Sequence, residues 1–167
     1  MRSDNLLDET SDDAASVREA LLRRAYEGEI IGCAMYDRMV SDPAYPKKDA
    51  LHLLYVVERI TAEALEPLIT RYHVAVDNES ATREGHQLAA ALSGQPWKDM
   101  WAKVIRLADD YLSDFRRLAD VLDGDDAAVG RQVVEHEEAL IAFAVREIAD
   151  ALDPLAPLVE YQRRYAR

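Results

Sequence analysis

Four long segments of the chain repeat apolar residues with the period of an α-helix. In the segment 48–73 the stripe falls at positions 51, 54, 58, 61, 65, 68 and 72, with spacings of three and four residues. Alternation with a period of two, which would indicate strands, is absent. Gly and Pro are scarce, at six each in 167 residues, which favours helix over strand. The sequence therefore predicts an all-α chain with long helices over 14–40, 48–73, 95–122 and 127–152.

The segments between and after these helices predict two shorter ones. The connection 74–95 contains an amphipathic stretch at 81–92 that begins after Ser80, a favourable N-cap. A last short helix is predicted over 158–165, beyond Pro154 and Pro157. Four long helices with such connections predict an antiparallel four-helix bundle over residues 14–153. Residues 1–13 are predicted to be an acidic tail, and 154–167 a C-terminal extension.

The composition narrows the classes of partner. The formal charge is −12 and the estimated pI is about 4.7, so the surface should repel nucleic acid and anionic lipid. No apolar run approaches the ~18 residues of a membrane span, and the N-terminus lacks a secretory pattern. A single cysteine, Cys33, cannot form an internal disulfide. We therefore expect a cytoplasmic protein with no nucleic-acid or membrane partner.

Polar residues interrupt the apolar stripes. Glu58 and Thr61 lie on the stripe of the second long helix, and His136 and Glu137 lie on the inward side of the last one. An ionisable group buried without a partner is expensive, so breaks in binary patterning tend to mark functional sites. These positions are therefore the first candidates for a site.

Helix geometry predicts that three of the polar residues are level. Glu29 lies about 15 residues before the turn at 43–46, and Glu58 about 13 residues after it, so the fixed rise of ~1.5 Å per residue brings them to one height. His136 lies about 12 residues after the turn at 123–126, near mid-height. Two carboxylates and an imidazole suit iron, manganese or zinc, and Glu137 could supply another oxygen. Tyr111, on the third long helix near that height, is the candidate catalytic residue: it could form a hydrogen bond with a ligand, or it could simply pack.

Gly28 and Gly32 lie one turn apart in the middle of the first helix. Each costs about 1 kcal/mol relative to Ala in a helix interior. We expect them to permit a close approach, either of a neighbouring helix or of a ligand in a cavity.

At these positions the chain resembles the ferritin-like superfamily, which includes rubrerythrins and bacterial di-iron carboxylate oxygenases. The resemblance is carried by the segments 26–29, 58–61 and 135–138, together with Phe143. It implies a ferritin-like bundle that holds two metal ions, with a Glu from each of two helices and Glu-x-x-His from the other two.

Carried over residue by residue, the ligand set is incomplete. Glu29 matches the first acid, and Glu58 matches the acid of one Glu-x-x-His, but Thr61 stands where its His should be. His136 matches the other His, but Val133 stands where its Glu should be. The resemblance thus implies one metal ion, a divergent pair completed by Glu137 and water, or a site that has lost metal.

Two functions remain open at this point. One is an iron- or manganese-dependent oxidoreductase or oxygenase that acts on a small molecule. The other is a metal-free binding or protein-interaction module that keeps Glu58 and His136 as a hydrogen-bonded polar layer. A homodimer is plausible for either. Separately, Arg71 and Glu147 are predicted to form a partly buried ion pair, on the assumption that their helices run parallel.

Overall fold

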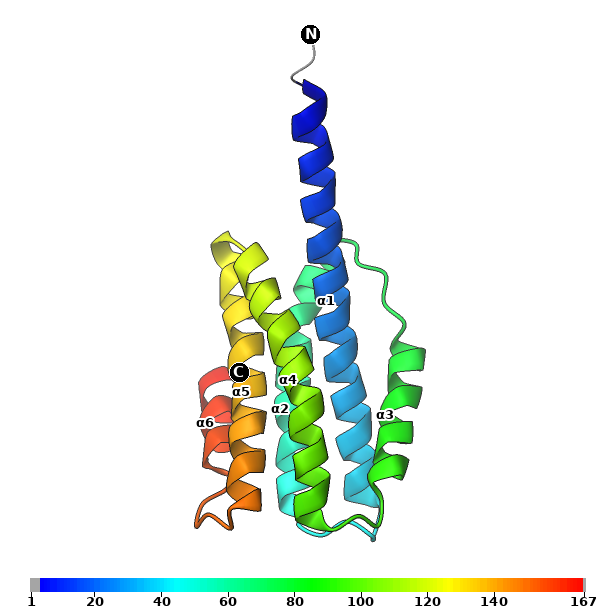
Figure 1. Cartoon of the computed structure of the whole chain (residues 1–167), viewed down its shortest axis with the longest axis vertical. Helices are drawn as coiled ribbons and strands as arrows, with labels where there is room; N and C mark the ends of the chain where they lie inside the picture. Colours follow the sequence, from blue (N-terminus) through cyan, green and yellow to red (C-terminus); the bar gives the residue numbers. More distant parts are fainter. Residues whose placement is uncertain (1–3, 167) are drawn as a thin grey trace.

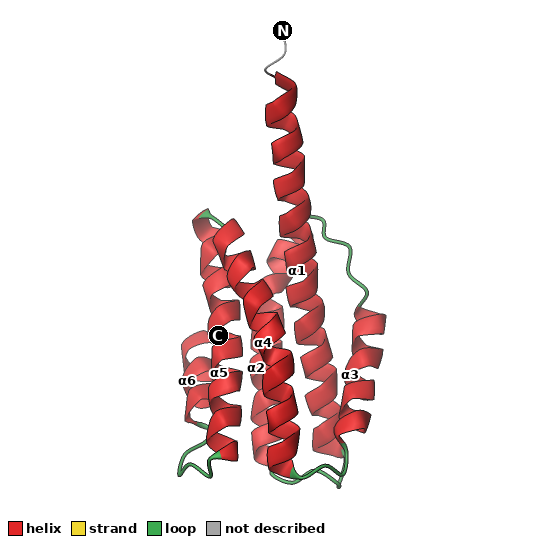
Figure 2. Ribbon diagram, viewed as in Figure 1, coloured by secondary structure: helices red, strands yellow, loops and turns green. Residues whose placement is uncertain are grey.

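The structure, a computed structural model, describes residues 4–166, and the side chains from residue 14 onward. Within that range all the regular structure is helical (Figure 2), which confirms the all-α prediction. No helix in this range combines the length and the apolar character that crossing a bilayer requires. The elements are α1 (Asp4–Ser41), α2 (Lys48–Arg71), α3 (Asn78–Leu92), α4 (Trp97–Val121), the 3-10 turn η1 (Gly124–Asp126), α5 (Ala127–Ile148) and α6 (Ala156–Tyr165).

The four longest helices lie side by side along the long axis of the molecule (Figure 1). In that view α1 and α5 run downward, whereas α2 and α4 run upward. The connection that contains α3 travels back down beside the C-terminal part of α1, so α4 starts at the same end as α2. Helix α6 packs on α5 and α2, on the opposite flank from α3.

A glycine lets α3 approach α1 closely. A Cβ at Gly85 would lie 2.4 Å from the carbonyl oxygen of Ile31 and 2.8 Å from the Cβ of Ala34, so only glycine fits at this crossing. The close contact fixes α3 against the outer face of α1. It thereby sets the path by which the chain returns to the end where α4 begins.

The apolar core is divided in two. One cluster contains Met39, Leu54 and Trp101, and the other contains Leu22 and Phe115. On each of α1, α2 and α5 the two clusters occupy different stretches. A layer of buried polar residues lies between these stretches or at their border, namely Glu29, Glu58, Thr61, His136 and Glu137, whereas Glu147 lies beyond them at the end of α5. The polar layer therefore separates two hydrophobic halves of the core.

The helix ends differ from the predicted ones at several places. Helix α1 begins at Asp4 rather than at residue 14, so most of the predicted acidic tail is helical, and residues 1–3 lie outside the described range. Acidic residues favour the N-terminal turns of a helix, which is consistent with this extension. Helix α3 begins at Asn78, capped by the side chain of Asp77, which accepts a hydrogen bond from the Ser80 amide. Helix α5 ends at Ile148, and Asp150 follows with φ of 52°.

The predicted ion pair between Arg71 and Glu147 is wrong. Arg71 instead binds Asp126, the last residue of η1 directly before α5, at 2.5 Å, and Glu147 at the end of α5 binds Lys47, at 2.5 Å. These two pairs place the end of α2 beside the start of α5, and the start of α2 beside its end. Because α2 and α5 run in opposite directions, Arg71 and Glu147 lie at opposite ends of the molecule.

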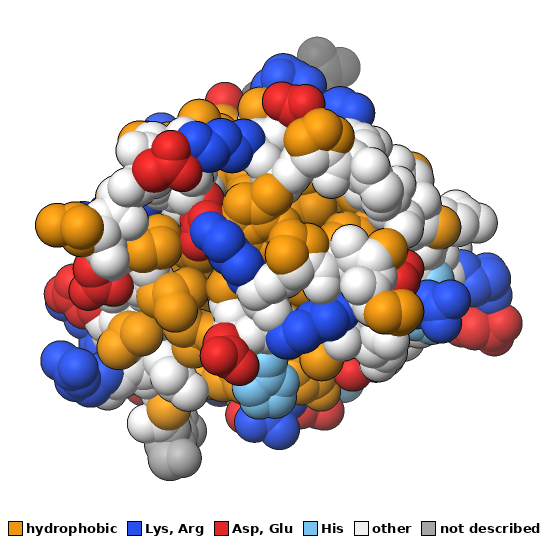
Figure 3. All heavy atoms as spheres, turned by 90° about the horizontal axis from the view of Figure 1, so that it is seen from below, with side chains coloured by type: hydrophobic (Ala, Val, Ile, Leu, Met, Phe, Trp, Pro, Cys, Tyr) orange, Lys and Arg blue, Asp and Glu red, His pale blue; other side chains and the backbone are white. Residues whose placement is uncertain are grey.

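The end of the molecule that carries the α1–α2, α3–α4 and α5–α6 connections has a mixed surface. Seen from below, hydrophobic side chains gather near the middle of this face and charged side chains surround them (Figure 3). The predicted homodimer stays a prediction.

Candidate metal centre

Glu29 of α1, Glu58 of α2 and His136 of α5 converge in the polar layer. One ligand atom from each lies within 4.8 Å of the others. The three residues are 1%, 5% and 1% exposed, so bulk solvent does not reach them. The prediction that these side chains share one height is confirmed, whereas their role as metal ligands stays a prediction.

The imidazole of His136 lies between the two carboxylates. Its Nδ1 is 3.3 Å from Oε2 of Glu29, and its Nε2 is 3.7 Å from Oε1 of Glu58. Neither nitrogen, nor Oε2 of Glu29, has a hydrogen-bond partner among the described residues. Leaving a buried polar atom unpaired costs about 1–3 kcal/mol, and native proteins do so rarely. The arrangement fits a cation that all three side chains would approach, because a cation accepts lone pairs from oxygen and from neutral imidazole alike.

Burial dominates the electrostatics of the two acids. It raises the pKa of Glu29 well above its usual range, and it does the same for Glu58, where the Glu29 carboxyl adds to the effect and His136 opposes it. Without a cation, the layer therefore favours protonated carboxyls. A bound divalent cation reverses that preference, because metal ligands must be deprotonated.

The two mid-helix glycines make room for side chains of neighbouring helices. A Cβ at Gly32 would lie 2.4 Å from the carboxyl carbon of Glu58, so glycine is needed for that carboxyl group to lie against α1. A Cβ at Gly28 would lie 2.8 Å from the ring of Tyr111. The predicted close approach at both glycines is therefore confirmed. At Gly32 the group that approaches is the carboxyl of Glu58, a candidate metal ligand.

Glu137 is buried but is not part of the group that converges on His136. Burial, assisted by Glu58 and Asp109 and opposed by His136, raises its pKa to about 8. A carboxyl group with such a pKa exchanges its proton near neutral pH. Whether Glu137 also contributes an oxygen to a metal stays a prediction.

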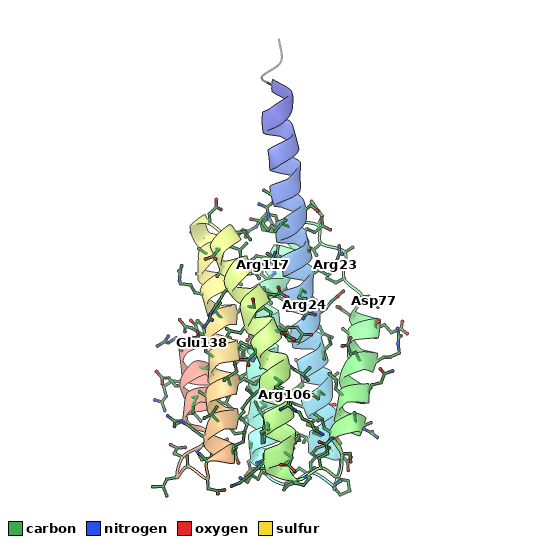
Figure 4. All side chains as sticks on the ribbon, viewed as in Figure 1. Arg23, Arg24, Asp77, Arg106, Arg117 and Glu138 are labelled. Atoms are coloured by element: carbon green, nitrogen blue, oxygen red, sulfur yellow. The ribbon has the colours of Figure 1, made fainter. Side chains whose placement is uncertain are left out.

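Tyr111 is half-buried beside Gly28. The guanidinium of Arg24 lies 4.3 Å from the centre of its ring, and Arg24 also binds Asp114 of α4 at 3.0 Å. Figure 4 labels Arg24 on the near side of α1, next to α4. Burial raises the pKa of the Tyr111 hydroxyl, and Arg24 opposes that shift. The catalytic role predicted for Tyr111 stays a prediction.

A cavity of about 260 Å³ borders the polar layer. Its walls come from α1, α3, α4 and α5, with one residue from α2, and they include Glu29, Glu58, Glu137 and Tyr111. The rest of the wall is mainly apolar: Ile31, Met35, Leu88, Val104, Leu107, Ala108, Phe115 and Leu140. The candidate site thus has a space beside it large enough for a small organic molecule.

Helix α6 supplies a contact to the site that sequence reasoning missed. The Tyr161 hydroxyl lies 2.6 Å from Oγ1 of Thr61 and accepts a hydrogen bond from Gln132 at 3.2 Å. Its ring centre is 5.5 Å from that of His136. Thr61 also donates to the Val57 carbonyl, at 3.0 Å. The polar break at Thr61 is therefore explained by Tyr161, and the spacing of positions 158, 161 and 165 was the signal that could have revealed this buried face.

Tyr36 is a second residue that sequence reasoning missed. It is 1% exposed and lines the cavity, and its hydroxyl has no hydrogen-bond partner among the described side chains and backbone. It lies two helical turns after Glu29, on the same face of α1, and that spacing was the available signal.

Comparison with models of protein families, with curated proteins and with solved structures gave no match to this chain.

Proposed function

We propose that α1, α2, α4 and α5 form a ferritin-like four-helix bundle that holds one iron or manganese ion through Glu29, Glu58 and His136. We further propose that the chain is an oxidoreductase that acts on a small molecule. The single observation that supports the proposal most strongly is the imidazole of His136, which is buried between two buried carboxyls with both nitrogens unpartnered. Most buried side-chain nitrogens in native proteins have a hydrogen-bond partner, so two unpartnered nitrogens on one imidazole favour a bound cation.

The ligand set favours one ion rather than two. Thr61 takes the place of one expected histidine and is committed to hydrogen bonds with Val57 and Tyr161. Val133, fully buried in one of the hydrophobic clusters, takes the place of one expected acid. Two carboxylates and one imidazole with open positions are a set that suits ferrous iron, and such an ion supplies oxygen-dependent redox chemistry when bound.

Residues of the chain provide the surroundings that such chemistry needs. The polar layer lies between two hydrophobic clusters, which limit the access of water to it. Glu137 is buried and lines the cavity, so its carboxyl group is placed to take up or release a proton beside a bound molecule. The cavity gives a small substrate access to the same carboxyls.

Metal content tests the proposal. Protein purified from cells supplied with iron and manganese, and protein reconstituted anaerobically with each ion, should hold about one ion per chain by elemental analysis. His136→Leu should abolish this binding. Glu147→Gln is the matched control, because Glu147 is an equally buried acid of α5 that lies outside the group. Less than about 0.1 ion per chain in the wild type after reconstitution would contradict the proposal.

The glycine that faces Glu58 offers a second test of the same site. Gly32→Ala places a methyl group where the Glu58 carboxyl lies, so it should lower metal affinity. Gly28→Ala, one helical turn before Gly32, is its matched control, because the added methyl group meets only the ring of Tyr111. Equal losses of metal affinity in the two variants would count against Glu58 as a ligand.

One observation favours the metal-free alternative. Burial raises the pKa of both Glu29 and Glu58, so protons alone can hold these two carboxyl groups in the uncharged form. A chain without metal would then be a binding or interaction module that retains the bundle. Failure of reconstitution in the wild type, with the fold intact, is the result that selects this alternative.

A further inference from the structure

The size of the cavity limits what it can hold. Its volume is about 260 Å³. An apolar cavity of about 150 Å³ is enough to hold a benzene molecule. In the same proportion, the cavity holds roughly ten non-hydrogen atoms, which accommodates a six-membered ring with a substituent of a few atoms but is too small for a nucleotide.

The chemistry of the wall limits the charge of the occupant. Met35, Val104, Ala108 and Leu140 make an apolar interior, and these residues are buried. The buried Asp, Glu, Lys or Arg side chains of the wall are all acids, namely Glu29, Glu58 and Glu137. Arg24 also lines the cavity, but it is exposed and forms an ion pair with Asp114, and the chain as a whole carries a charge of −12. An anion would be repelled by the buried acids and would lose its hydration in the apolar part. The wall therefore favours a neutral molecule.

Tyr36 provides one polar contact in this wall. Its ring stacks on Trp101, with 6.5 Å between ring centres, so the side chain is held in place. Its hydroxyl is buried and lacks a partner among the described residues. A hydroxyl group both donates and accepts, and burying it unpaired is unfavourable. A molecule in the cavity with one hydroxyl group would satisfy it.

We infer that the cavity binds a small, neutral, single-ring molecule with one hydroxyl group, of which phenol is the simplest example. The ring lies among Met35, Val104, Ala108 and Leu140, and the hydroxyl pairs with that of Tyr36. As a substrate site the cavity depends on the metal function proposed above, but the binding of the ring does not require the metal.

The test uses the full chain, freed of metal by dialysis against a chelator, and three probes of similar size. Phenol should bind at a ratio of one to one, toluene should bind too, and benzoate should bind at least about tenfold more weakly than phenol because of its charge. Calorimetry measures the three affinities. Absence of phenol binding, or benzoate binding as tight as that of phenol, would overturn the inference.

Two variants locate the ring and its hydroxyl. Tyr36→Phe should weaken phenol binding about five- to tenfold, the value of one hydrogen bond, and leave toluene binding unchanged. Ala108→Leu fills the cavity and should abolish binding of both, whereas Ala90→Leu, at an exposed position of α3, should not. Equal effects of Tyr36→Phe on phenol and toluene would show that the hydroxyl contact is not made.

A spectroscopic measurement keeps the test decisive if Ala108→Leu does not fold. In protein with labelled methionine methyl groups, phenol should shift the resonance of Met35, which lines the cavity, more than that of Met39, which is buried outside it. A shift of Met39 alone would place the probe elsewhere. Because no metal is present, failure of metal binding leaves this result standing, and failure of phenol binding leaves the metal proposal standing.

Discussion

The buried acids at the two ends of the molecule differ sharply from those in its middle. At one end Glu147 binds Lys47 and accepts a hydrogen bond from the indole of Trp97 at 2.8 Å. At the other end Asp126 binds Arg71 and accepts a hydrogen bond from Tyr72 at 2.8 Å. In the middle, Glu29 lies against His136 without any such partner for Oε2.

The difference lies in the partners: each of the two end acids pairs with a basic side chain. Lys47 and Arg71 reach the two end acids from the surface, and their side chains are 51% and 57% exposed. Long basic side chains can pair with a buried acid while they keep contact with water. In the middle layer no Lys or Arg side chain of the described residues pairs with Glu29 or Glu58 in this way, and the nearest basic group is the imidazole of His136. A bound cation would pair with the carboxyls of the middle layer as Lys47 and Arg71 pair with the end acids.

The largest expected effect is stabilisation by metal. A hundredfold excess of ion over its dissociation constant should raise the free energy of unfolding by about 2.7 kcal/mol. For a chain of 167 residues this corresponds to a rise of about 5–10 °C in the melting temperature, measured by calorimetry. His136→Leu should show no rise, and Glu147→Gln should show the full rise. An equal rise in the melting temperature of wild type and His136→Leu would show that the metal does not bind at the middle layer.

Removal of a paired end acid should destabilise the protein. Glu147→Ala leaves the indole N–H of Trp97 and the ammonium group of Lys47 without their partner, so we expect a loss of about 2 kcal/mol. Chemical denaturation measures the loss. Glu66→Ala, at an exposed position of α2, is the control and should change stability by less than about 0.5 kcal/mol. No loss in Glu147→Ala would show that the end pairing contributes little.

Removal of the middle polar groups should have the opposite sign in metal-free protein. Glu58→Met combined with His136→Leu replaces two desolvated polar groups by apolar groups of similar size. We expect a gain of about 1–2 kcal/mol in the free energy of unfolding, because buried polar groups without full pairing are often less stable than apolar packing. The same denaturation assay applies. A loss of stability would mean that the layer is satisfied by its own contacts and needs no cation.

The smallest expected effect concerns pH. Burial opposes ionisation of Asp126, but the hydrogen bonds from Tyr72 and Arg71 outweigh burial and lower its pKa. A depressed pKa contributes stability that is present above the unfolded value of about 3.9 and is lost as pH falls through the folded value. The stability difference between wild type and Asp126→Asn should therefore be constant above about pH 5 and shrink in acid.

The middle acids have raised pKa values and act in the opposite direction, but they are common to both proteins and cancel in that difference. Urea denaturation between about pH 3 and 7 gives the two curves. A difference that grows as the pH falls would contradict the assignment of Asp126 as a paired, ionised acid.

Much of the site could be predicted because it depends on local regularities. Glu58 and His136 break apolar stripes, so their burial follows from helix periodicity alone. Their common height follows from the constant rise of a helix. His136 lies near the middle of α5, so its height is the same whichever way that helix runs, and the prediction did not depend on direction.

Predictions that depended on direction or on contacts between distant segments were less successful. Arg71 and Glu147 lie at helix ends, so the direction of α5 relative to α2 decides whether they meet. Likewise the hydroxyl of Tyr161 reaches Thr61 only because α6 folds back onto α2 and α5. Neither fact leaves a periodic signal in the sequence.

The sequence by itself determined the helices, their inward faces and the level at which acids and histidine would be buried, because these follow from the fixed geometry of one helix at a time. The tertiary structure alone decided the direction of α4 and α5, the partners of the end acids, and the cavity beside the polar layer. The physical reason is that directions and partners depend on packing between segments distant in the sequence: α3 packs closely on α1 at Gly85, and the chain thereby returns to the end where α2 begins before α4 starts.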